Sequence, residues 1–135
     1  MRVLPCTSDI VAVGDCAEKR DFVTRKLDRT MLASTACAEA RTAGMNLYSL
    51  SPCKPFTGTI AIYSTAIGNH AFGTAGITEA RATAENFSVI CGSFTGMDTH
   101  PGNLEHSHKQ MVKLIVASDC GMILGAEVYG GTSVG

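Results

Sequence analysis

Two apolar runs near the end of the chain are separated by three residues that are typical of a tight turn. The runs are QMVKLIVAS at 110–118 and MILGAEVYG at 122–130, and Asp119-Cys120-Gly121 stands between them. A three-residue loop with glycine in the left-handed conformation often joins adjacent antiparallel strands. The sequence therefore predicts a β-hairpin, and the fold must contain an antiparallel sheet.

Three more strands are predicted upstream of the hairpin from apolar and β-branched residues. They are expected at 58–68, at 70–77 and at 87–97, the last with a bulge or bend at Gly92. A short helix is predicted over 78–86, where Thr78 is a suitable N-cap. The polar segment 98–108 contains Pro101-Gly102 and predicts a turn. The fold class that follows is α+β, a mostly antiparallel sheet with helices packed on one side.

The first fifty residues combine a short apolar run, a Gly-Asp pair and a segment rich in small residues. Residues 10–13 predict a buried strand that stops at Gly14-Asp15. A charged surface loop is expected over 16–28, and then a helix over 31–47 whose N-cap is Asp28 or Thr30.

In an α/β sheet, ligands lie beyond the carboxyl ends of the strands, where helix N-termini attract anions and polar groups. We therefore interpret the strand, the Gly14-Asp15 pair and the helix over 31–47 as one corner of a cofactor site. The alternative is that the alanines simply make a good helix former.

The composition argues against several classes of protein. The chain has 135 residues, with 11 basic and 12 acidic side chains, so it carries no signal for binding a polyanion. It holds neither an apolar run of membrane-spanning length nor a signal peptide. We expect a cytoplasmic protein with a core of its own that neither binds nucleic acid nor spans a membrane.

The cysteines and histidines suggest metal or disulfide chemistry only weakly. No two cysteines form a C-x-x-C motif, and we expect all six to be reduced and to act as small buried hydrophobes, without a catalytic role; they are Cys6, Cys16, Cys37, Cys53, Cys91 and Cys120. Cys16 stands out because it follows Asp15. A second cluster, formed by Asp98, His100, His106 and His108, has ligand types that suit zinc. A solvated histidine-rich loop is the preferred interpretation, with no metal site.

Four stretches carry a resemblance to a known family. VAVGDCAE at 11–18 and LASTACAEARTAGMNLY at 32–48 resemble the end of the FAD domain in pyridine-nucleotide disulfide oxidoreductases, nearest to the NADH oxidase and coenzyme A-disulfide reductase group. TAGITEARA at 74–82 and KLIVASDCGMILGAEVYGG at 113–131 resemble the family's dimerisation domain. The resemblance implies a remnant of the FAD-binding domain over 1–56 and a dimerisation domain, itself shortened at its end, over 57–135.

The resemblance also implies roles for single residues. Asp15 matches the aspartate that hydrogen-bonds the ribityl or phosphate part of FAD, so Gly14 and Asp15 would hold the tail of the flavin. The helix N-terminus near Leu32 and Ala33 would point at the flavin ring and steady its charge.

Tyrosines of the dimerisation domain reach the partner's active site in coenzyme A-disulfide reductases. Neither Tyr63 nor Tyr129 matches that role, so we expect both to pack in the core or in an interface with the hydroxyl at the edge. Nothing near His70 in the sequence supports a proton-transfer role.

Departures from the family shape the functional expectation. A Gly-rich dinucleotide loop, a redox cysteine and a second nucleotide domain open the family but have no counterpart here, and the family continues past the position of Gly135. We expect a C-terminal piece of an FAD-dependent NAD(P)H oxidoreductase, of the NADH oxidase or disulfide/persulfide reductase type. In isolation it would lack FAD and activity. The alternatives are a non-catalytic homodimerisation module and, less favoured, a metal-binding protein.

The expected partners are the missing FAD and NAD(P)H domains and a second copy of the chain. In the family, the first fifty residues pack against the FAD domain, so the apolar faces of 9–48 would lose a partner here. Self-association through a symmetric contact is the simplest way to cover them.

Overall fold

The computed structural model describes residues 10–47 and 56–132, and the chain divides into two compact units, Met1–Ile60 and Ala61–Gly135. We call them the first unit and the sheet unit. Residues 48–55, just before the expected domain boundary, lie outside the described residues, as do Cys6 and Cys53. The domain boundary placed after residue 56 therefore stays a prediction.

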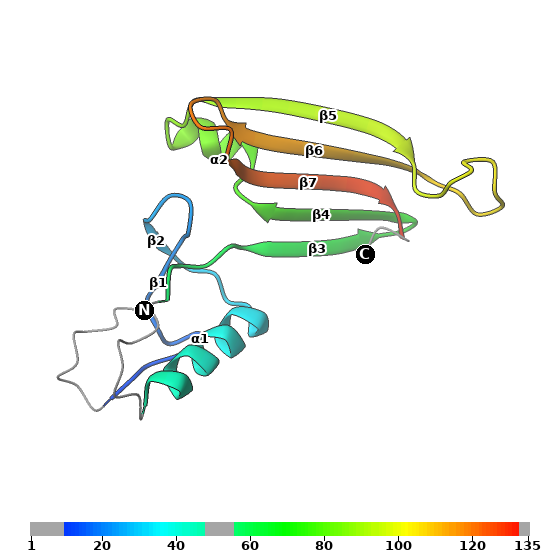
Figure 1. Cartoon of the computed structure of the whole chain (residues 1–135). Coiled ribbons are helices and arrows are strands. Elements are labelled where there is room, and N and C mark those ends of the chain that lie inside the picture. The colour runs from blue at the N-terminus through cyan, green and yellow to red at the C-terminus, as the bar shows by residue number, and fades with distance from the viewer. Residues whose placement is uncertain (1–9, 48–55, 133–135) are drawn as a thin grey trace. The chain divides into compact units, whose positions relative to one another are not determined.

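A five-stranded antiparallel sheet forms the sheet unit (Figure 1). Its strands lie in the order β3-β4-β7-β6-β5. Their bounds are β3 Ile62–Ile67, β4 His70–Gly76, β5 Val89–Met97, β6 Lys109–Ala117 and β7 Ile123–Gly131. All five predicted strands exist, with ends that differ from the expectation by at most four residues, and the predicted fold class is confirmed.

The β6–β7 hairpin has the predicted glycine turn. Gly121 has φ +70° and its N–H donates to the carbonyl of Ala117 at 3.0 Å. The N–H of Ala117 donates in turn to the carbonyl of Met122 at 2.8 Å. Glycine stands at the one position of this turn where a side chain would be strained.

The bulge expected at Gly92 is wrong. β5 pairs with β6 without interruption, and Gly92 lies opposite Leu114. The irregularity lies instead in the β6–β7 ladder between Ile115 and Val116. Gly125 is the glycine that this region requires, because a Cβ there would stand 1.9 Å from the carbonyl oxygen of Ile77.

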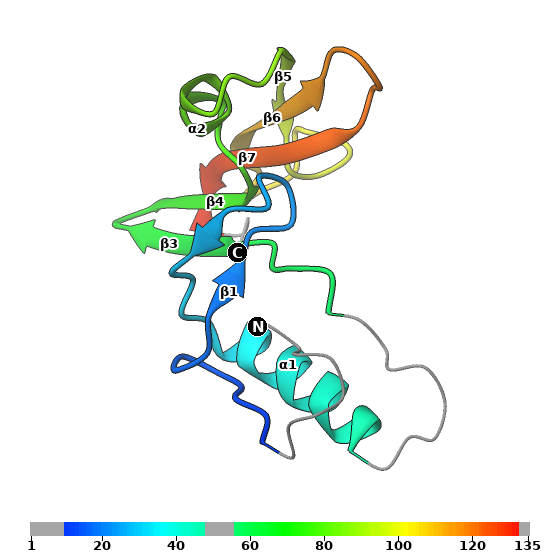
Figure 2. The same ribbon diagram turned by 90° about the vertical axis from the view of Figure 1, so that its left-hand side faces the viewer.

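A single short helix, α2 Glu79–Ala84, connects β4 to β5 and lies on one side of the sheet (Figure 2). The hydroxyl of Thr78 accepts a hydrogen bond from the N–H of Arg81 at 3.2 Å, so the predicted N-cap is confirmed. Ile77 and Ala82 are fully buried at this end of the sheet, with Ile115 and Leu124. They form the apolar core.

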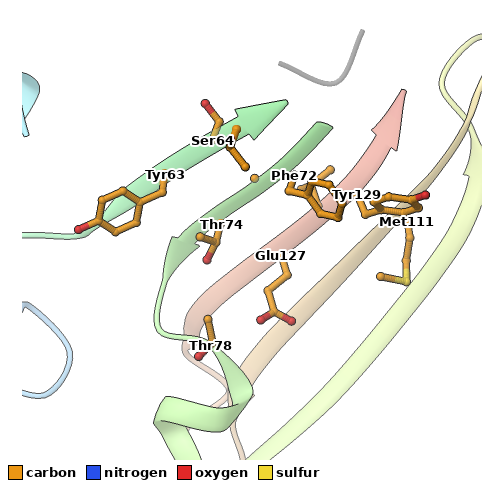
Figure 3. Close-up of a pocket in the computed structure, with 11 residues that line it drawn as sticks. Tyr63, Ser64, Phe72, Thr74, Thr78, Met111, Glu127 and Tyr129 are labelled. Carbon is orange, nitrogen blue, oxygen red and sulfur yellow. The ribbon is translucent and has the colours of Figure 1, made fainter. Parts of the chain in front are cut away.

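The same face of the sheet forms a groove of about 460 Å³, which extends from Thr78 at the start of α2 along the strands (Figure 3). Its walls include Tyr63, Phe72, Met111 and Tyr129. Tyr63 and Tyr129 are therefore on an open surface and do not pack in the core. The other expectation, that they pack in an interface, stays a prediction. Short strands without a second sheet or a longer helix above them leave these rings uncovered among the described residues.

The opposite face of the sheet exposes large apolar side chains. Alternation along each strand brings Ile62, Ile90, Phe94 and Leu114 to this face. Phe94 is 74% exposed and the other three are exposed as well. Within the described residues of the sheet unit, nothing covers this face.

Little regular structure is present in the first unit. Its elements are the two-residue strands β1 Lys19–Arg20 and β2 Leu27–Asp28, which pair antiparallel, and the helix α1 Ala33–Asn46. The segment expected to be a charged loop is thus a small ribbon. Its turn is closed by Asp21, whose buried carboxylate accepts from the N–H groups of Val23 at 3.0 Å and Thr24 at 2.7 Å.

The buried strand expected at 10–13 is wrong. Residues 10–13 are not in a strand, and Ile10 is 85% and Val11 49% exposed. An apolar run becomes a strand only where a neighbouring strand takes up its N–H and C=O groups. No described strand pairs with this one.

The predicted helix is confirmed as α1, but its N-cap is different. Leu32 occupies the N-cap position without a side-chain hydrogen bond, and the hydroxyl of Thr30 bonds to the carboxylate of Asp28 instead. Neither of the two residues expected to cap the helix does so. No helix in the described part of the chain is long and apolar enough to cross a membrane.

Four described cysteines, Cys16, Cys37, Cys91 and Cys120, are free and exposed. The expectation that they are small buried hydrophobes is wrong for these four. They occupy outward positions of a turn, a helix, a strand and a hairpin loop.

Candidate functional site

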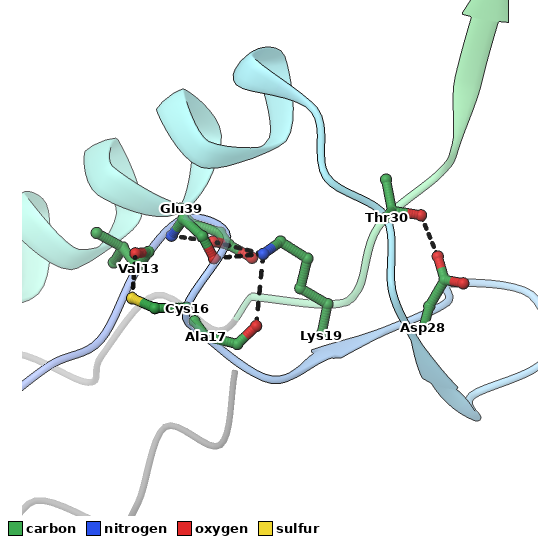
Figure 4. A network of polar contacts seen from close by, with 8 residues as sticks. Val13, Cys16, Ala17, Lys19, Asp28, Thr30 and Glu39 are labelled. Carbon is green, nitrogen blue, oxygen red and sulfur yellow. Dashed lines mark hydrogen bonds and ion pairs between the residues drawn. The ribbon is translucent and has the colours of Figure 1, made fainter.

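The Gly14-Asp15 pair lies in a tight turn, residues 14–17, which we call the Gly-Asp turn (Figure 4). Gly14 has φ +82°, a conformation that side chains rarely adopt. Its carbonyl accepts from the N–H of Ala17 at 3.0 Å, which closes the turn. The thiol of Cys16 donates to the carbonyl of Val13 at 3.4 Å.

A glutamate of α1 is hydrogen-bonded to the backbone of the turn. The Oε2 atom of Glu39 accepts a hydrogen bond from the N–H of Gly14 at 2.8 Å. Glu39 has no exposed surface. A Cβ on Gly14 would lie 3.8 Å from the Cβ of Ala36, so the turn sits directly on the helix.

Lys19 of β1 completes this network. Its ammonium donates to the carbonyls of Gly14 and of Ala17, the latter at 3.4 Å, and lies 3.8 Å from Oε2 of Glu39. The Lys19 side chain is only 2% exposed. A buried ammonium needs polar partners. The two carbonyls accept hydrogen bonds from it, and the carboxylate of Glu39 balances its charge as an ion pair.

Asp15 takes no part in this network. It is exposed, and its carboxylate makes no hydrogen bond or ion pair with any other described residue. The turn thus presents one carboxylate to solvent, while its backbone is hydrogen-bonded by Glu39 and Lys19.

Leu32 and Ala33 lie at the N-terminus of α1, as expected. The first hydrogen bond within the helix runs from the N–H of Ala36 to the carbonyl of Leu32 at 3.0 Å. The N–H groups of the first turn therefore have no acceptor within the helix. Ala33 precedes Ala36 by about 4.5 Å along the helix axis, so the uncapped N-terminus of α1 lies close to the part of the helix on which the Gly-Asp turn sits.

Sequence reasoning missed Lys19 and Glu39. One signal was available: Glu39 is the only acidic residue of α1 and stands between Ala38 and Ala40. A single carboxylate on an alanine-rich helix indicates a buried partner. The identity of that partner is not visible locally, because Gly14 lies 25 residues away.

A second polar cluster lies on the grooved face of the sheet unit. Lys113 hydrogen-bonds Glu79 and lies 3.3 Å from Oε2 of Glu127. The hydrogen bond from Lys113 lowers the pKa of Glu79. Hydrogen bonds to Glu79 and to Glu127 raise the pKa of Lys113. Partial desolvation and the charge of Glu79 raise the pKa of the nearby Cys91 thiol, so this cysteine is not activated as a nucleophile.

The histidine cluster assembles only in part. Asp98 accepts from the N–H of His108 at 2.8 Å and lies 3.5 Å from its Nδ1. His100 and His106 do not join them. Among residues 10–47 and 56–132, no three His, Cys, Asp or Glu side chains gather closely enough to hold a metal ion.

Tyr129 and His70 meet at the end of the groove. The Tyr129 hydroxyl and Nδ1 of His70 are 3.0 Å apart, and the two rings stack with centroids 5.5 Å apart. Phe72 lies against the same tyrosine. The hydrogen bond joins two neighbouring strands but connects to no further acid or base in the described residues.

Comparison with known proteins gives a consistent result. No family profile matches the chain. Over 129 residues it is 26% identical to an NADH oxidase of Methanocaldococcus jannaschii, a match that covers 93% of this chain and 27% of the oxidase.

Solved structures share the fold. The NAD-dependent persulfide reductase from A. fulgidus superposes with a TM-score of 0.75 at 22% identity, over 88% of this chain and 22% of that one. An FAD-dependent pyridine nucleotide-disulphide oxidoreductase from Desulfovibrio vulgaris superposes with a TM-score of 0.59 at 21% identity, over 86% and 26% of the two chains. The chain spans about a quarter of the length of the proteins it matches.

Proposed function

We propose, from the premise that this chain shares sequence and fold with the C-terminal part of the pyridine nucleotide-disulfide oxidoreductases, that it supplies one edge of a flavin site and a dimer interface. The complete protein would be an FAD-dependent NAD(P)H oxidoreductase of the cytoplasm. Its acceptor would be dioxygen, as in an NADH oxidase, or a thiol, disulfide or persulfide.

The Gly-Asp turn is the observation that carries this proposal. An exposed carboxylate on a turn seated against α1 is suited to accept hydrogen bonds from hydroxyl groups of a sugar-like chain. The N–H of Gly14 is already taken by Glu39. Gly14 therefore contributes its conformation, and Asp15 makes the contact with the tail of the flavin.

Leu32 and Ala33 contribute the unbonded N–H groups of the first helical turn. No acidic residue occupies this turn, so the partial positive charge of the helix N-terminus is not neutralised. These groups fit a polar or anionic part of FAD. When bound in the complete enzyme, the flavin carries reducing equivalents from NAD(P)H to the acceptor, whereas the residues of this chain orient and stabilise it.

The chain alone is proposed to bind no FAD and to have no activity. Asp15 and one helix terminus offer a few hydrogen bonds, each of about 1 kcal/mol net, and no Gly-rich loop cradles the pyrophosphate. An absorbance spectrum from about 300 to 550 nm, with mass spectrometry of released cofactor, tests this. FAD near one per chain would contradict the proposal.

A hybrid protein tests the flavin role directly. This chain would replace the matching quarter of the Methanocaldococcus jannaschii NADH oxidase, and FAD would be measured after gel filtration. We expect the hybrid to retain FAD, Asp15→Ala to lose it, and Asp119→Ala in the exposed hairpin loop to retain it. Equal FAD content in both variants would remove Asp15 from the site.

Dimerisation is proposed through the apolar face of the sheet that contains Ile62, Ile90, Phe94 and Leu114. An exposed apolar face on this scale is costly in water, and a symmetric contact covers it on both copies. The non-catalytic dimerisation module is the second candidate function, and this same face favours it. The two candidates differ in FAD retention by the hybrid.

Light scattering of the free chain tests the interface. We expect a dimer for the wild type, a monomer for Phe94→Glu, and a dimer for Thr95→Glu, which places the same charge on the opposite face of the strand. A monomeric wild type would contradict the proposed interface.

A further inference from the structure

We propose that Glu39, acting with Lys19, is a positioning residue for the Gly-Asp turn and so for the flavin. The inference rests on the proposed function, which assigns this turn to FAD. It goes beyond it by naming the two residues that set the direction of the Asp15 carboxylate.

Every polar contact that Glu39 makes with the described residues goes to the turn network. Its Oε2 atom bonds the N–H of Gly14 and faces the ammonium of Lys19, while Oε1 is buried without a hydrogen-bond partner among the described residues. A carboxylate without exposed surface is costly unless it is paired. α1 thus buries the carboxylate of Glu39, whose interactions are made with the Gly-Asp turn and with Lys19.

Lys19 holds the other side of the same residue. Glu39 takes the N–H of Gly14, and Lys19 donates to the carbonyl of Gly14 and to that of Ala17. Both backbone polar groups of Gly14 are therefore bonded by the pair. The backbone of Gly14 is held at φ +82°. The backbone of the next residue in the turn, Asp15, is therefore held as well, and with it the direction in which the Asp15 side chain leaves the backbone.

A role in stability alone explains this arrangement poorly. Replacing a buried ion pair by apolar side chains of similar volume is often neutral or stabilising. Such a replacement would, however, remove the acceptor of the Gly14 N–H and the two hydrogen bonds that Lys19 donates to the turn. The specific contribution of Glu39 and Lys19 is thus the conformation of the turn, held ready before the cofactor arrives.

The double variant Lys19→Met/Glu39→Leu separates the two roles, because it leaves no unpaired buried charge. Its matched control is Glu18→Leu/Arg20→Met, which removes a neighbouring pair, 3.9 Å apart, whose side chains are 56% and 59% exposed. Lys19→Met/Glu39→Gln is the conservative variant, since its amide oxygen can still accept from the N–H of Gly14 and no buried charge is left unpaired. Each would be prepared as the full 135-residue chain and within the hybrid oxidase.

Amide hydrogen exchange of Gly14 in the free chain gives a readout that needs no cofactor. We expect exchange at least about tenfold faster in the double variant, because a hydrogen bond to a carboxylate is lost. The control and Lys19→Met/Glu39→Gln should stay within about threefold of wild type. Unchanged exchange of Gly14 in the double variant would overturn the inference.

FAD retention by the hybrid gives the second readout. We expect the apparent dissociation constant for FAD to rise about tenfold in the double variant while its unfolding midpoint stays near that of the wild type. Wild-type affinity in a double variant whose Gly14 amide exchanges faster would also overturn the inference. A wild-type hybrid without FAD would instead refute the proposed function, and Gly14 exchange alone would then decide whether the pair positions the turn.

Discussion

The two units of this chain bury opposite kinds of side chain. Among the described residues, every buried apolar side chain lies in the sheet unit: Ala61, Ala71, Ile77, Ala82, Ile115, Ala117 and Leu124. Every buried polar or charged side chain lies in the first unit: Lys19, Asp21, Thr30, Thr35, Glu39 and Thr59. Neither list contains a member from the other unit.

This difference separates two ways of building structure. Apolar burial is non-directional, so it stabilises a sheet without determining any single turn. Hydrogen bonds to buried charges are directional and demand a particular backbone arrangement. The first unit uses the second way, and its bonds converge on the Gly-Asp turn and on the turn closed by Asp21.

The largest effect should come from breaking the buried pair in the first unit. Glu39→Ala leaves the ammonium of Lys19 buried without its charge partner, which costs about 3–5 kcal/mol. We expect the first unit to lose its structure while the sheet persists, visible as two separate unfolding transitions by hydrogen exchange. Glu18→Ala, at an exposed position, should change stability by less than about 0.5 kcal/mol. A single cooperative loss of both units would break the comparison.

A smaller effect is expected from overpacking the sheet unit. Gly125→Ala would place a Cβ 1.9 Å from the carbonyl oxygen of Ile77 and should destabilise the sheet by about 1–3 kcal/mol. Gly92→Ala is the control, since a Cβ there meets nothing within 4 Å. Thermal unfolding followed by circular dichroism measures both. Similar unfolding midpoints for the two variants would show that the backbone at Ile77 shifts at little cost to make room for the added Cβ.

Removal of the helix cap should cost about 1 kcal/mol. Thr78→Ala removes the oxygen that accepts from the N–H of Arg81. Thr83→Ala serves as the control, because the Thr83 hydroxyl bonds only the carbonyl of Glu79 within the helix. Urea unfolding should rank Thr78→Ala below both the control and the wild type. An equal midpoint for the two would mean that the cap contributes nothing to the sheet unit.

The smallest effect is a dependence of sheet stability on pH. The pKa of Glu79 is lowered from 4.5 by Lys113, so its contribution is present above 4.5 and is lost as the pH falls through the folded-state value. The pKa of Lys113 is raised from 10.5, so its contribution is present below 10.5 and is lost as the pH rises further. Lys113→Met should weaken the dependence of stability on pH at both the acidic and the basic end. NMR titration should then show that the pKa of Glu79 has moved back towards 4.5. An unmoved pKa would remove Lys113 as the cause.

How much the sequence predicted depends on how local the determinants of each feature are. The hairpin around Gly121 and the cap at Thr78 depend on neighbours within a few residues, and both were predicted correctly. The strand at 10–13 was predicted from its apolar residues alone, although a strand also needs a neighbour to bond. Gly92 was chosen for a bulge, yet the glycine that the fold requires is Gly125, because the carbonyl that excludes a side chain there belongs to Ile77.

The candidate site was predicted only in outline. Gly14, Asp15, Leu32 and Ala33 could be selected from their positions relative to a turn and a helix. The buried residues beneath the turn could not, because the bond between Gly14 and Glu39 joins residues 25 apart. No periodic pattern records such a contact.

The strand order of the sheet has a consequence for how the protein is made. β7 is the last strand in the chain but lies in the middle of the sheet, between β4 and β6. On the ribosome, the β3–β4 and β5–β6 hairpins can each form early, but each keeps one unpaired edge until β7 has been synthesised. The sheet unit therefore folds as a whole only after β7 has been synthesised, and its two half-sheets depend until then on the absence of other strands that could pair with them.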